Sequence, residues 1–143
     1  MTTYADLFAR YRARHGALRE PVQGWDSLAP ALHLAYSIGR VRGFTDLGTY
    51  VDKQGDHGGT YTARRPPAWA FDLGRRNRFY NRGWNYWAAR RLAKLYVREH
   101  EALAIEYVIL GRRIWSREKG WHAFTRDSSH LWHLHVSGHW PGR

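Results

Sequence analysis

HLWHLHVS, residues 130–137, is the stretch from which the expected fold and site both follow. Side chains alternate between the two faces of a strand, so His133, His135 and Ser137 would share one face and Leu134 and Val136 the other. Five of the nine histidines fall near the C-terminus: His122, His130, His133, His135 and His139. Neutral imidazole is the commonest metal ligand among side chains. The polar face of this strand is therefore predicted to carry part of a metal site.

The length of 143 residues predicts one domain, 1–143, that can bury a hydrophobic core. The chain has no cysteine, which excludes disulfides and thiolate metal sites, so any zinc must be held by His and carboxylate groups. No apolar run approaches the roughly 20 residues that cross a bilayer. The N-terminus has no charged segment followed by an apolar one, so we expect no signal peptide.

The charge of the chain predicts a polyanionic partner. It has 23 Lys and Arg against 12 Asp and Glu, a formal net charge of +11. Nucleic acid and the anionic polymers of a bacterial wall both fit this charge. The eight Trp and nine Tyr suit stacking on bases or on sugar rings, so composition does not choose between these partners.

We predict an α+β fold: a small antiparallel sheet with helices packed on one side. Hydrophobic spacing predicts helices over 3–15, 27–38 and 77–100, with Gly39 ending the second. Strands are predicted over 45–54, 68–73, 105–110 and 121–124, followed by the His strand. Residues 1–40 would form a helical scaffold and 45–140 the core that carries the site.

The third predicted helix has an aromatic stripe and a basic side. The stripe contains Trp84, Trp87, Ala88, Leu92, Leu95 and Tyr96 and is predicted to face the sheet. The other side carries Arg82, Arg90, Arg91, Lys94 and Arg98. These cations would face solvent or contact the polyanion.

Asp72 stands out in its strand, because Trp69, Phe71 and Leu73 would share the opposite face. A buried carboxylate is costly unless it is paired or bound to a metal. An edge-strand Asp that faces water or pairs with an Arg is the alternative. A hydrolytic zinc site needs three ligands, an open position and a base. The sequence offers His57, Asp72 and His135 as ligands, with His133 as general base and acid.

Several segments resemble one family. A His followed by an Asp, the run YVILGRRIWS at 107–116, a Trp-containing hairpin, and the His-x-x-His-x-His of 130–135 are together similar to zinc peptidases of the hedgehog/D-Ala-D-Ala-peptidase fold. The phage-encoded peptidoglycan endopeptidases and carboxypeptidases of that group are the most similar. The resemblance covers about residues 45–140.

The resemblance implies zinc on His57, Asp72 and His135, with His133 as the base and His130 assisting it. It also implies an Arg that orients the substrate, for which the candidates are Arg64, Arg65, Arg112 and Arg113. Two features depart from the common form of the family. Gly55 stands where that form has a Ser, two positions before the first ligand. Asp72 follows His57 by 15 positions, which is a longer His-to-Asp spacing than in the common form. If His57 is not a ligand, Asp56 or His122 is the substitute.

The sequence thus predicts a zinc metallopeptidase that hydrolyses an amide bond in the stem or cross-link peptide of bacterial peptidoglycan. Such a phage-type lytic enzyme would be made in the cytoplasm and act on the wall after release or as part of a virion. A basic nucleic-acid-binding protein or metal-dependent nuclease is one alternative, although the chain lacks a recognisable nucleic-acid motif. An inactive zinc protein that binds wall peptide is the other.

Overall fold

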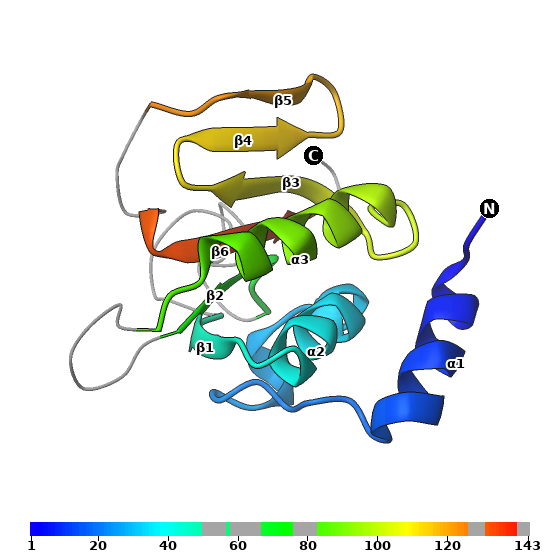
Figure 1. Cartoon of the computed structure of the whole chain (residues 1–143). Coiled ribbons are helices and arrows are strands. Elements are labelled where there is room, and N and C mark those ends of the chain that lie inside the picture. The colour runs from blue at the N-terminus through cyan, green and yellow to red at the C-terminus, as the bar shows by residue number, and fades with distance from the viewer. Residues whose placement is uncertain (50–56, 58–66, 76–82, 126–130, 140–143) are drawn as a thin grey trace.

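A computed structural model describes residues 1–49, 57, 67–75, 83–125 and 131–139 of the 143-residue chain. It has an α+β architecture in which helices and strands are mixed along the chain, as predicted (Figure 1). The α-helices are α1 (Tyr4–His15), α2 (His33–Val41) and α3 (Tyr86–Arg98). The strands are β1 (Thr45–Gly48), β2 (Ala70–Gly74), β3 (Ile105–Leu110), β4 (Arg113–Ser116), β5 (Gly120–Ala123) and β6 (His133–Gly138).

The first helix begins and ends where the sequence predicts. Thr3 caps α1 through a capping box, in which its hydroxyl accepts from the backbone N–H of Asp6 and the Asp6 carboxylate accepts from the backbone N–H of Thr3. Gly16 follows the helix with φ of 77°, a left-handed conformation that glycine adopts without strain. This helix packs against α2 and does not contribute to the candidate site.

The second helix differs from its prediction at both ends. Residues 25–32 form two short 3-10 turns, Trp25–Ser27 and Pro30–Leu32, and the α-helix begins only at His33. Gly39 does not end the helix, which continues to Val41. A Cβ on Gly39 would lie 2.2 Å from Leu73 Cδ1 and 2.8 Å from the Tyr96 hydroxyl oxygen. Glycine is therefore required here because α2 approaches β2 and α3 closely.

The sheet has six strands in the order β1-β2-β6-β3-β4-β5, and every neighbouring pair is antiparallel. The last strand in the sequence, β6, lies in the middle, between β2 and β3 (Figure 1). It joins a β1–β2 half to a β3–β4–β5 half. The strand predicted from the His stretch is thus a central strand that positions residues from both halves.

One face of the sheet is covered by α2 and α3 (Figure 1). Its core contains apolar side chains from both layers, including Tyr36, Phe71, Leu73, Leu92, Tyr96, Val108, Leu134 and Val136. Leu134 and Val136 are fully buried, so the apolar face of β6 is the core face, as the alternation predicts. The histidines of β6 consequently point to the opposite face, which carries the candidate site.

The predicted third helix is partly wrong. It starts at Tyr86, after the Asn85 cap, so Trp84 precedes it, and the part of the prediction over 77–82 lies outside the described residues. Trp87 is 62% exposed and does not join the core. The buried residues of α3 are Ala89, Leu92, Ala93 and Tyr96. The core stripe is therefore made of small and aliphatic residues with one aromatic ring.

The remaining strands follow the predicted pattern with shifted ends. β3 coincides with the predicted 105–110, and β5 starts one residue early, at Gly120. β1 ends at Gly48, before the predicted end, and positions 50–54 of that prediction lie outside the described residues.

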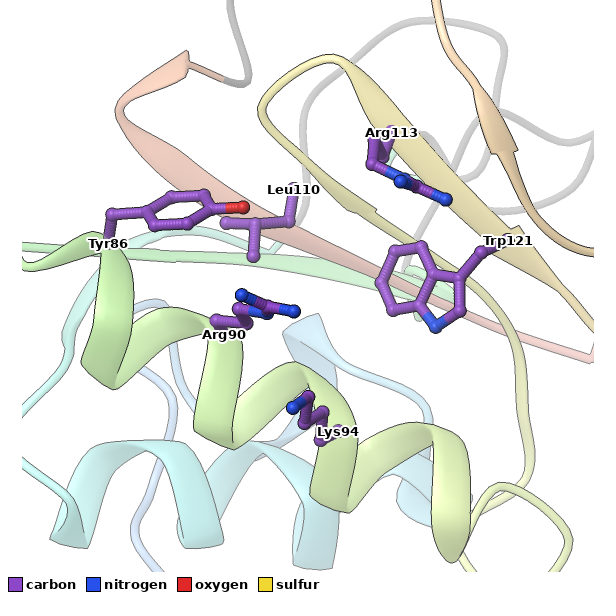
Figure 2. A pocket seen from close by; sticks show the side chains of 6 residues that line it. All are labelled: Tyr86, Arg90, Lys94, Leu110, Arg113 and Trp121. Carbon is purple, nitrogen blue, oxygen red and sulfur yellow. The ribbon is translucent and has the colours of Figure 1, made fainter.

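Between α3 and the ends of β3, β4 and β5 lies a cavity of about 380 Å³ (Figure 2). Within the described part of the chain, no helix is long and apolar enough to cross a membrane.

Candidate metal centre

The candidate centre starts from two residues that the sheet places opposite each other. Asp72 of β2 and His135 of β6 are direct partners in the antiparallel pair, so their side chains extend from the same face. His135 Nδ1 lies 2.9 Å from Asp72 Oδ1. Their strand neighbours Phe71, Leu73, Leu134 and Val136 are all buried on the other face. The alternation predicted for both strands therefore brings these two groups together.

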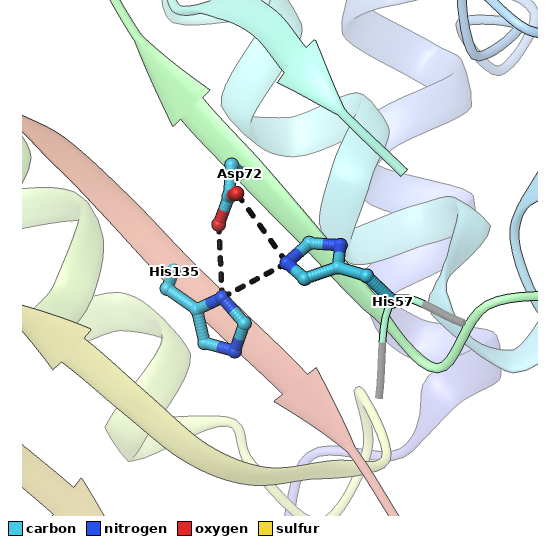
Figure 3. A group of neighbouring side chains, drawn as sticks. All are labelled: His57, Asp72 and His135. Carbon is cyan, nitrogen blue, oxygen red and sulfur yellow. Dashed lines mark hydrogen bonds and ion pairs between the residues drawn. The ribbon is translucent and has the colours of Figure 1, made fainter. Parts of the chain in front are cut away.

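His57 completes the group from outside the sheet (Figure 3). Its Nε2 lies 3.1 Å from His135 Nδ1 and 3.3 Å from Asp72 Oδ2. The side chains are 14% exposed for His57, 23% for Asp72 and 7% for His135, so the group is largely shielded yet reachable. The three ligands proposed from sequence, although far apart in the chain, converge on one point.

The separations of these atoms fit a small tetrahedral cation. Zinc bound at about 2.0–2.1 Å in tetrahedral geometry holds its ligand atoms roughly 3.3 Å apart. His135 Nδ1 lies 2.9 Å from Asp72 Oδ1 and 3.1 Å from His57 Nε2, and His57 Nε2 lies 3.3 Å from the other carboxylate oxygen, Asp72 Oδ2, so the two rings face different oxygens of one carboxylate. Two imidazoles and a carboxylate are also a ligand set that zinc takes in hydrolytic enzymes. The described residues can thus hold a metal ion, and zinc suits both the donor types and their spacing.

The hydrogen bond on the far side of His57 fixes which nitrogen faces the cluster. Its Nδ1 lies 2.8 Å from the carbonyl oxygen of Thr49. A carbonyl only accepts, so Nδ1 carries the hydrogen, and in neutral imidazole Nε2 presents its lone pair. That lone pair faces a carboxylate oxygen of Asp72 at 3.3 Å. Two acceptors at this distance repel each other unless a second proton or a metal cation lies between them.

Asp72 is ionised in this environment. Burial raises the pKa of its carboxyl group, but hydrogen bonding to His135 and His57, together with their charges, lowers it by more. The net pKa lies well below the ordinary carboxyl value. A metal cation at the same point would supply the positive charge without a second proton on either ring. The carboxylate is therefore in the form that binds metal.

His133 lies beside the three ligand candidates, on the same face of β6. Its Nε2 is 3.6 Å from Asp72 Oδ1, and its side chain is 13% exposed. It pairs with Gly74 across β2, which leaves no facing side chain on that strand. His133 therefore lies next to the three ligand candidates, and its role as a base stays a prediction.

Sequence reasoning did not identify the residues that support the ligands. Thr49, 1% exposed, lies with its Oγ1 2.8 Å from Ser27 Oγ and 2.8 Å from Gln23 Oε1, so these contacts hold Thr49 itself against residues 23 and 27. Tyr107 stacks on His135, with ring centroids 5.6 Å apart and planes at 21°. No spacing signal marks these residues, because their roles depend on the register between strands and on contacts between distant loops.

Of the other predicted site residues, the three that the structure describes do not lie at the cluster. Arg113 pairs with Leu110, a core residue, and both line the cavity on the helix-covered face. Arg112 is exposed in the turn between β3 and β4. His122, the substitute ligand, lies in β5 at the far end of the sheet. His130, Arg64, Arg65 and the second substitute, Asp56, lie outside the described residues.

Comparisons with known proteins give no significant match, whether to a protein family, to a curated protein or to a solved structure. The likeness to the hedgehog/D-Ala-D-Ala-peptidase fold therefore stays a prediction. The functional argument depends on the geometry of His57, Asp72 and His135 and on the residues around them.

Proposed function

We propose that this protein is a zinc hydrolase that cleaves an amide bond in the peptide of bacterial peptidoglycan. The observation that carries the proposal is the convergence of His57 Nε2, His135 Nδ1 and the Asp72 carboxylate on one point. The His57 lone pair faces an Asp72 oxygen there, and a metal cation would relieve their repulsion without a second proton on the ring. The cationic surface and the resemblance of the His strand to wall peptidases support the choice of substrate.

A zinc ion held by these three residues would polarise a substrate carbonyl and lower the pKa of water to about 7. His57, Asp72 and His135 would set the place of that ion. The backbone carbonyl of Thr49 accepts a hydrogen bond from His57 Nδ1 and so keeps the lone pair of Nε2 directed at that place. Tyr107 holds the ring plane of His135 by stacking.

His133 performs the proton transfers. Its Nε2 accepts a proton from the attacking water as the carbon–oxygen bond forms. It then donates that proton to the amide nitrogen as the carbon–nitrogen bond breaks. The second proton of the water stays on the new carboxyl group and then passes to the amine, so the products are one carboxylate and one ammonium group, and atoms and protons balance. The position of Nε2, 3.6 Å from Asp72 Oδ1, puts it within reach of a water beside the ligands.

Digestion of purified peptidoglycan tests this proposal. The purified full-length protein, supplied with zinc, is incubated with wall material, and newly exposed amino groups are counted. We expect amino groups to appear with the wild type and to fall by about 10²-fold or more in His133→Ala, because a general base contributes roughly 10²–10⁴-fold. Mass spectrometry of the fragments then identifies the bond that is cleaved.

His122→Ala is the matched control for His133→Ala. The strand register places Asp72, His135, Ile109, Ile114 and His122 in one row across the sheet. His122 therefore lies on the same face of the sheet as the cluster, but on the edge strand β5. We expect its cleavage rate to equal that of the wild type. Zinc content should stay near one ion per chain in both variants. A His133→Ala protein that cleaves wall at the wild-type rate would refute the role of His133, and a wild type that cleaves nucleic acid but not wall would refute the substrate.

A further inference from the structure

The cavity between α3 and the strands is a second candidate site, on the other face of the sheet from His57, Asp72 and His135. Its lining consists of Tyr86, Arg90, Lys94, Leu110, Arg113 and Trp121 (Figure 2). Leu110 is buried in the core that α3 covers. The adjacent residue Ile109 pairs with His135 and so faces the opposite side. The sheet thus separates the cavity from the candidate metal centre.

The described lining of this cavity is cationic and contains no carboxylate. Arg90 and Lys94 extend from α3 towards the strands, and Arg113 extends from β4 (Figure 2). Arg90 and Lys94 are four positions apart in a helix, where like charges destabilise each other. Across the described part of the chain, no acidic side chain forms an ion pair with any of these three cations. An external anion would relieve the repulsion.

Two aromatic rings flank the same cavity. Tyr86 is 43% exposed and Trp121 is 37% exposed, so both rings reach solvent at the cavity. An exposed indole offers a flat apolar face with a polar edge, which suits the C–H face of a sugar or polyol. The lining therefore combines groups for an anion with groups for the carbon skeleton beside it.

We propose that this cavity binds a phosphate group, with its adjoining sugar or polyol, of an anionic wall polymer. Guanidinium groups match the geometry of phosphate through paired hydrogen bonds, and two of the three cations are Arg. The volume of about 380 Å³ is within the range of small-ligand sites. The choice of a wall polymer rests on the proposed function, whereas the anion site itself does not.

The arrangement favours a polyol phosphate over nucleic acid. Proteins that bind single strands use a groove that follows the backbone, with successive rings for successive bases. Here the three cations and both rings line one cavity. Such a concentration of charge suits one phosphate with a small neighbour. Bound there, the polymer would hold the enzyme on the wall while the opposite face stays open to peptide.

Calorimetric titration of the full-length protein with poly(glycerol phosphate) tests the site. The test variant is the double substitution Arg90→Gln and Arg113→Gln. The control is Arg91→Gln with Arg117→Gln, which removes the same charge from the same helix and the same hairpin, at exposed positions outside the lining. We expect the test variant to bind at least about tenfold more weakly, since two charge-assisted hydrogen bonds are lost. The control should change by less than about twofold.

Four outcomes would overturn the assignment. Equal losses in both double variants would mean binding by overall charge. Equal affinity for polyglutamate would remove the preference for phosphate. Tighter binding of a single-stranded oligonucleotide with the same number of phosphates, abolished in the test variant, would assign the cavity to nucleic acid. Loss of binding in His135→Ala would show that the two sites are not separate. Intact polymer binding without wall cleavage would instead count against the proposed function alone.

Discussion

Asp72 Oδ1 lies 2.9 Å from His135 Nδ1, because the two residues are direct partners across β2 and β6. Asp72 and His135 are 63 positions apart in the sequence, and the pairing of their strands brings together two of the three ligand candidates of the metal centre. His57 is the third candidate, and its orientation depends on the carbonyl of Thr49.

The support for His57 is tested at Thr49. Replacing Thr49 by Val removes the hydroxyl that contacts Ser27 and Gln23, so the Thr49 carbonyl that orients His57 is held less firmly. We expect zinc affinity to fall about tenfold, the lower end of the range for outer contacts of metal ligands. Competition with a fluorescent chelator measures it. Thr49→Ser keeps the hydroxyl and should keep wild-type affinity; equal affinity in all three proteins would contradict this role.

The close packing of α2 is tested at Gly39. A methyl group at this position would overlap Leu73 Cδ1 and the Tyr96 hydroxyl, so we expect Gly39→Ala to reduce the free energy of unfolding by about 1–3 kcal/mol. Urea denaturation measures the change. Leu73→Val removes the atom that clashes first, so the double variant should lose less than the sum of the two single losses. Strict additivity would show that Gly39 and Leu73 do not conflict.

Asp72 couples stability to pH in the metal-free protein. Burial raises its pKa, but the hydrogen bonds and charges of His135 and His57 lower it further, so the folded carboxyl titrates below its unfolded value of about 3.9. Stabilisation from this group is complete above the unfolded pKa and disappears as the pH falls below it. In the presence of a chelator, Asp72→Asn should lose less stability than the wild type between about pH 5 and pH 3. An equal loss in urea denaturation would contradict the shift.

The sequence predicts well those features that depend on local alternation. The two faces of β6, the opposite faces of Phe71 and Asp72, and the end of α1 at His15 follow from the pattern of adjacent residues. The convergence of His57, Asp72 and His135 was also proposed from sequence. In that case the chemistry of zinc ligands and a family resemblance supplied what spacing alone lacks.

Features that depend on tertiary contacts were predicted poorly. Gly39 has the pattern of a helix terminator, yet it serves close packing between three elements. Trp87 fits the apolar stripe of α3 but lies outside the core. The buried face of the helix contains Ala89, Leu92 and Ala93 instead. The supports at Thr49 and Tyr107, and the cationic cavity, require the strand register and the position of α3, which no local pattern contains.

Metal analysis of the purified, zinc-exposed full-length protein tests the central claim most directly. We expect about one zinc per chain in the wild type, and strongly reduced zinc in His57→Ala, Asp72→Ala and His135→Ala, because each removes one of three ligands. His133→Ala and His122→Ala should keep the ion, with circular dichroism confirming that all variants fold. A folded wild type without zinc, or ligand variants that retain it as the wild type does, would contradict the account.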